Sequence, residues 1–192
     1  MDSQAPSKLD RRSFLKRAGI GSLALGPLPG LLAATPAGAS GRAAGFNFTA
    51  ISQAGTIGSV VHAVNMAGSG TIKRHDVEGG GHFQHYDLAS APPRTIIAAG
   101  AWRAKRLVSF DPIGTWGVIT AGVLVTQIEL RRTIPSPAVV AATLEVVCNV
   151  GSAGLDTGKP EGFTLTVPGA PFGAFVPIEA GITVFTTIAA VH

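Results

Sequence analysis

Hydrophobic and polar residues alternate one by one along several stretches of this chain. Residues 143–150 read TLEVVCNV, with apolar side chains at every second position, and residues 124–130 and 163–167 show the same period. Because neighbouring side chains on a strand point to opposite faces, this period predicts strands with one buried face. Weaker candidates for strands are residues 46–51, 60–66, 70–77, 81–87, 96–101, 103–110, 116–120, 172–176 and 183–191.

Residues that favour turns separate these candidate strands. They lie at positions 67–70, 92–93, 111–114, 121–122, 135–137, 151–158 and 168–171. Residues 40–192 contain no convincing helical period and no break in composition. The pattern therefore predicts a single all-β domain, an antiparallel β-sandwich or a closed β-barrel of about ten short strands.

The first 39 residues have a different character. Arg11 and Arg12 are followed by Phe14 and Leu15, and then by an uncharged, Gly-rich run. This order resembles a twin-arginine export signal. The resemblance implies export by the twin-arginine translocase to the periplasm or the extracellular space, with cleavage after Ala39. Glycine and proline disfavour a helix of spanning length, so we expect no stable membrane span after processing.

Removal of the expected signal changes the charge of the chain. Five of its 15 Lys and Arg residues and two of its 11 Asp and Glu residues lie in the signal, which leaves ten basic and nine acidic residues. Such a balance argues against a nucleic-acid partner. The single Cys148 cannot form a disulfide within the chain, and its place in the apolar phase of residues 143–150 predicts a buried thiol.

Residues 79–87, GGGHFQHYD, contain the densest group of side chains that can bind a metal ion or act in acid–base chemistry. On a strand, His82 and Tyr86 point to one face, while His85 and Asp87 point to the other. Two histidines three residues apart bind one metal ion readily on a helix, but on a strand they diverge. The stretch alone is therefore a poor ligand set.

A metal site at this stretch needs ligands from a neighbouring strand. We predict His82, His85, Asp87 and His75 as candidate ligands, and His62 can also approach across a hairpin. Imidazole and carboxylate groups suit copper or zinc. The alternative is a strand with one solvated face and no metal, and this alternative is favoured, so no cofactor is predicted.

Other chemistries receive little support from the sequence. There is no G-x-S-x-G motif, and residues 154–160 match a phosphate-binding loop only in part. We therefore do not expect the protein to be an enzyme. Tyr86, Trp102 and Trp116 are candidates for contact with an apolar ligand, although packing in the core is the favoured explanation for both tryptophans.

Several stretches together, GGGHFQHYD, AWRAKRLVSF, TWGVITAGVLV and TLEVVCNVG, resemble small secreted bacterial β-proteins without an assigned function. The resemblance implies no activity. We therefore expect a non-catalytic binding or structural domain whose partner is a small molecule or a protein. The alternatives are a small copper or zinc protein, with or without redox activity, and a barrel that binds or isomerises a hydrophobic molecule.

Overall fold

The computed structural model describes residues 43–188. The expected export signal, with Arg11, Arg12 and the cleavage site at Ala39, lies outside the described residues. Between residues 43 and 188 the chain forms eight β-strands and one short 3-10 helix, η1 (Gly151–Ala153). The strands are β1 Ala44–Ile57, β2 Val60–Lys73, β3 Asp76–Asp87, β4 Ile96–Trp116, β5 Ile119–Ile134, β6 Ala138–Cys148, β7 Gly162–Thr166 and β8 Val176–Thr187. None of the described residues forms a helix with the length and apolar character needed to cross a membrane.

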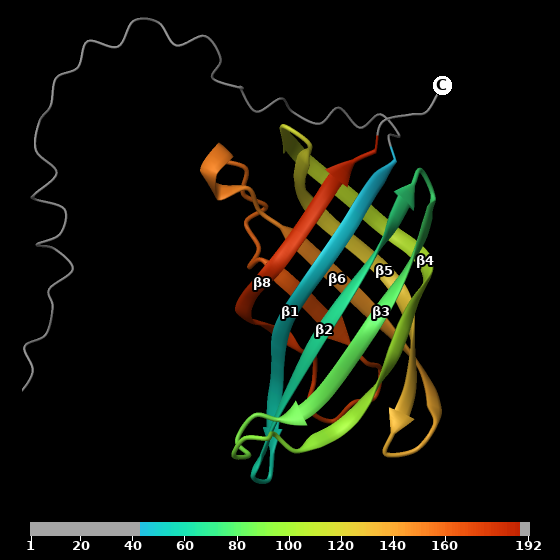
Figure 1. The fold of residues 1–192 in the computed structure, drawn as a ribbon, viewed down its shortest axis with the longest axis vertical. Coiled ribbons are helices and arrows are strands. Elements are labelled where there is room, and N and C mark those ends of the chain that lie inside the picture. The colour runs from blue at the N-terminus through green and yellow to red at the C-terminus, as the bar shows by residue number, and fades with distance from the viewer. Residues whose placement is uncertain (1–42, 189–192) are drawn as a thin grey trace, which may run out of the picture. The chain divides into compact units, whose positions relative to one another are not determined.

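All eight strands belong to one antiparallel sheet. Their order is β4-β3-β2-β1-β8-β5-β6-β7, and a further pairing joins β4 to β5. This pairing extends from Ala99 opposite Ile134 to Trp116 opposite Ile119, so the sheet returns to its starting strand and forms a ring (Figure 1). The prediction of an all-β antiparallel fold is confirmed, and the sheet is barrel-like.

The strands are fewer and longer than the period of the sequence indicated. Residues 67–70, which the sequence predicted as a turn, lie inside β2, and the glycines at 79–81 lie inside β3. A Cβ atom on Gly68 would stand 2.2 Å from Cζ2 of Trp102, and one on Gly79 would stand 2.7 Å from Cζ of Phe46. These glycines therefore make room for aromatic rings against the sheet. The turn falls at residues 74–75, inside a predicted strand, and Arg74 has a φ of 34°.

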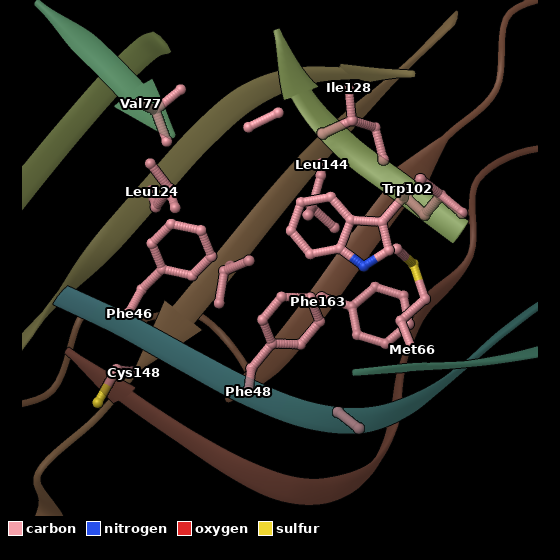
Figure 2. Close-up of a cluster of buried hydrophobic side chains, with 14 of the residues drawn as sticks. Phe46, Phe48, Met66, Val77, Trp102, Leu124, Ile128, Leu144, Cys148 and Phe163 are labelled. Carbon is pink, nitrogen blue, oxygen red and sulfur yellow. The ribbon is translucent and has the colours of Figure 1, made fainter. Parts of the chain in front are cut away.

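Large apolar side chains from the inward faces of the strands fill the middle of the ring. The ring centroid of Phe48 lies 5.8 Å from those of both Trp102 and Phe163 (Figure 2). Cys148 is buried among them, as expected, and its Sγ donates a hydrogen bond to the Thr183 carbonyl at 3.2 Å. Burial raises the pKa of this thiol. Other fully buried members of this core are Met66, Leu124, Ile128, Leu144 and Phe185.

Three connections meet at one end of the ring. They are the β1–β2 turn, the loop of residues 88–95 and the β7–β8 connection of residues 167–175. Leu88 donates its backbone N–H to the Val61 carbonyl at 2.8 Å, and Gly55 donates to the Phe172 carbonyl at 2.9 Å. These hydrogen bonds tie the loop of residues 88–95 to β2 and the β7–β8 connection to β1, next to the β1–β2 turn. We call this end, visible at the bottom of Figure 1, the histidine end.

Candidate functional site at the histidine end

Two histidines from adjacent strands face the interior at this end. On β2, His62 shares a face with the buried Val64 and Met66, because these residues are two positions apart. Val64 lies opposite His85 of β3, and His62 lies opposite Asp87. His62 and His85 are therefore diagonal neighbours on the inner face of the β2–β3 hairpin. The register of this hairpin is what brings them together.

The two imidazole rings form a hydrogen-bonded pair. Nδ1 of His62 lies 2.9 Å from Nε2 of His85, and the ring centroids are 5.1 Å apart. The His62 side chain is only 9% exposed, and His85 is half-buried. We call His62 and His85 the histidine pair.

Two phenylalanines from the β7–β8 connection cover the histidine pair. Phe172 stacks on His62, with centroids 4.6 Å apart and ring planes 28° apart. Phe175 meets His85 edge to face, at 5.2 Å and 81°. The backbone holds both in place, because Phe172 accepts from Gly55 and Phe175 exchanges two hydrogen bonds with Leu165 of β7. The pair thus has an aromatic wall fixed to β1 and β7.

The surroundings favour the uncharged form of His85. Burial, together with the positive charge that His62 can carry, lowers the pKa of His85 from 6.5 to about 4. Asp87, which lies opposite His62, accepts hydrogen bonds from the N–H groups of Val61 and Ala89, both at 3.0 Å. No charged residue occurs in the covering segment 167–175, in residues 53–57 of β1 or in residues 96–101 of β4. In the loop of residues 88–95, the exposed Arg94 donates to the carbonyls of Leu88 and Ser90.

The structure does not gather all four residues that were predicted as metal ligands. His85 and Asp87 share the inner face of β3, but His82 is exposed on the other face. His75 is exposed in the turn that joins β2 to β3. Among residues 43–188 there is no group of three or more His, Cys, Asp or Glu side chains placed to hold a metal ion.

The three aromatic residues proposed as ligand contacts lie in three different environments. Trp102 is 2% exposed in the core, and its indole N–H donates to the Ala67 carbonyl at 3.1 Å. Trp116 ends β4 and is 41% exposed. Tyr86 is half-buried on the face of β3 opposite His85. Among the described residues, neither tryptophan shares a ring contact with the histidine pair.

The sequence did not reveal the role of Phe172 and Phe175. Its pattern predicts a strand at residues 172–176, yet Phe175 forms only an isolated bridge with Leu165. Residues 168–171, PGAP, already marked a connection in the sequence. No local signal shows that this connection folds over the inner face of the β2–β3 hairpin.

Comparison of the chain with protein families, curated proteins and solved structures gives no match.

Proposed function

We propose that this chain is an exported, non-catalytic binding protein that holds a small, mostly apolar molecule at its histidine end. The observation that carries the proposal is the histidine pair under its aromatic wall. It combines a few convergent polar atoms with apolar walls, which is the usual composition of a site for small molecules. Export is proposed from the twin-arginine resemblance of the N-terminal residues.

The middle of the ring offers less support for a ligand site. Phe48, Trp102 and Phe163 pack against one another there, and the side chains around them are buried. At the histidine end the core gives way to partly buried side chains, among them Phe172, Ala98 and Val167. This difference favours the histidine end over the middle of the ring as the place where a ligand meets the interior.

A metal ion is the less favoured ligand. The pair itself consists of suitable donors, but His82 and His75 lie elsewhere, and the covering segment supplies phenylalanine rather than donor atoms. The pair already satisfies one nitrogen of each ring by a mutual hydrogen bond. These contacts support a site for an organic molecule.

Two measurements on protein purified from its native host test the proposal. Native mass spectrometry should detect a small organic molecule that co-purifies, and NMR should show changes at the His62 and His85 rings when that molecule is extracted. His82, exposed on the other face of β3, provides the internal control. Stoichiometric copper or zinc in elemental analysis, or ring signals that do not respond to extraction, would contradict the proposal.

A further inference from the structure

The number of protons on the histidine pair limits the hydrogen bonds that the pair can form with a ligand. A neutral imidazole has one N–H group and one nitrogen with a free lone pair. The hydrogen bond between Nδ1 of His62 and Nε2 of His85 uses one N–H and one lone pair. When both rings are neutral, the remaining nitrogens, Nε2 of His62 and Nδ1 of His85, comprise one donor and one acceptor, whichever ring donates. We call these the outer nitrogens.

The outer nitrogens are not sealed in the core. Within residues 43–188, the only side-chain nitrogen or oxygen that is fully buried without a hydrogen-bond partner is Oγ1 of Thr183. The described residues supply no hydrogen bond to either outer nitrogen beyond the one inside the pair. Since a sealed and unpaired ring nitrogen would be a second atom of this kind, both outer nitrogens keep some contact with solvent, although His62 is only 9% exposed.

We propose that the ligand is an uncharged molecule whose apolar body carries a hydroxyl group, and that this hydroxyl binds to an outer nitrogen. The inference rests on the proposed function and specifies its ligand class. A hydroxyl both donates and accepts, so it matches either outer nitrogen in either arrangement of the shared proton. The apolar body packs on Phe172 and Phe175, in place of water.

Charged ligands fit this end poorly. The covering segment 167–175 contains no Lys or Arg to balance an anion, and Arg94 of the loop of residues 88–95 donates to the carbonyls of Leu88 and Ser90. Asp87 has its Oδ1 occupied by the N–H groups of Val61 and Ala89. An ion placed against two phenylalanines would lose its hydration without gaining a partner, which is costly. The contacts therefore select for neutral molecules.

Three probes of similar shape test the ligand class. They are 4-ethylphenol, which has the hydroxyl, 4-ethylanisole, in which a methyl group blocks it, and 4-ethylbenzoate, which is an anion at neutral pH. Dissociation constants are measured at pH 7.5 from the NMR shifts of the His62 and His85 rings. We expect 4-ethylphenol to bind about five-fold more tightly than 4-ethylanisole, the effect of one net hydrogen bond of about 1 kcal/mol. We expect 4-ethylbenzoate to bind most weakly.

The possible outcomes distinguish failure of the proposed ligand class from failure of the proposed binding site. Equal binding of 4-ethylphenol and 4-ethylanisole, or tightest binding of 4-ethylbenzoate, overturns the hydroxyl class but leaves a ligand site at the histidine end. If no probe shifts the two rings, both the class and the proposed function fail.

Two variants test whether the preference for 4-ethylphenol over 4-ethylanisole arises from the histidine pair. His62→Phe keeps an aromatic ring against Phe172 and removes the nitrogens, so the five-fold preference for 4-ethylphenol should disappear. His82→Gln changes an exposed histidine on the other face of β3 and should keep the preference. A preference that survives in His62→Phe places the hydroxyl elsewhere and overturns the inference. If His62→Phe does not fold, the wild-type ring nitrogen shifts on 4-ethylphenol binding decide between an outer nitrogen and another site.

Discussion

Gly68 illustrates how the absence of one side chain shapes the core. A Cβ atom at this position would lie 2.2 Å from the Trp102 ring and 2.8 Å from the Gly80 carbonyl. Trp102 is itself fixed by its packing on Phe48 and its hydrogen bond to Ala67, so it has little room to move. In the sequence, this glycine looked like part of a turn, because turns and close packing both favour glycine.

Substitution of Gly68 by Ala should therefore destabilise the fold by about 2 kcal/mol, as overpacking commonly does. Urea unfolding followed by tryptophan fluorescence measures the change in the free energy of unfolding. Gly151→Ala is the matched control, because a Cβ there has no atom within 4 Å, and its effect should stay within roughly 0.5 kcal/mol. Equal effects of the two substitutions would show that the Trp102 contact does not limit this site.

His85 gives the stability of the protein a defined pH dependence. Its pKa is lowered from 6.5 to about 4, so between these values the unfolded chain binds more protons than the folded chain. The contribution is fully present above pH 6.5 and is lost as the pH falls towards 4. Because His85 is only half-buried, we expect a loss of about 1–2 kcal/mol rather than the full value of the shift.

His85→Gln should flatten the plot of unfolding free energy against pH in this range, as measured by urea unfolding at a series of pH values. His82→Gln, on the exposed face of the same strand, should leave the slope of the wild type unchanged. A wild-type slope in His85→Gln would assign the pH dependence to another group.

At the scale of elements, the strands could be predicted from the sequence better than the connections. Residues 124–130, 143–150 and 163–167 have a clear period of two, and they correspond to parts of β5, β6 and β7. The period could not show that residues 96–116 form a single strand. Proline at position 112 and glycine at 114 resemble a turn, but β4 continues through them with a shift in register between Pro112 and Gly114.

The histidine pair was only partly predictable for a related reason. Strand geometry separates His82 from His85 correctly, and it leaves His62 as a partner across the hairpin. The register between β2 and β3 decides which residue of β2 lies beside His85, and this register depends on where β2 ends. The sequence predicted a strand across residues 74–75, where the turn between β2 and β3 lies. The aromatic wall depends on a contact between residues more than 80 positions apart along the chain, and no local pattern encodes it.

The covering segment should control the environment of the pair. In Phe172→Ala the loss of the ring exposes His62 and His85 to water, so the pKa of His85 should rise from about 4 towards its ordinary value. We also expect the free energy of unfolding to fall by about 2 kcal/mol, since Phe172 is only partly buried. NMR titration of the histidine ring protons measures the pKa.

Phe172→Leu tests whether the apolar side chain over the histidine pair is what keeps the pKa of His85 low. Leucine keeps an apolar side chain over His62, so the pKa of His85 should remain low. If both variants leave the pKa of His85 at its wild-type value, burial by this segment is not what lowers it.

At the scale of the whole molecule, the proposal of export makes a separate prediction. Replacing Arg11 and Arg12 by lysine should abolish export, because the paired arginines carry the resemblance to a twin-arginine signal. Fractionation of bacterial cells that express the full chain measures the exported amount. Lys8→Gln, which changes a charge outside the motif, should be exported normally. Wild-type export of the double lysine variant would refute the proposed route.

The pairing of β1 with β8 joins the first strand of the ring to the last. Ala44 lies opposite Thr187, and the ladder continues to Gln53 opposite Val176. During synthesis, β1 has no partner on this side until the ribosome has released the final strand. Partial chains therefore expose an open sheet edge, which invites association with other chains. The proposed export route for folded proteins would therefore accept this chain only after β8 has paired with β1.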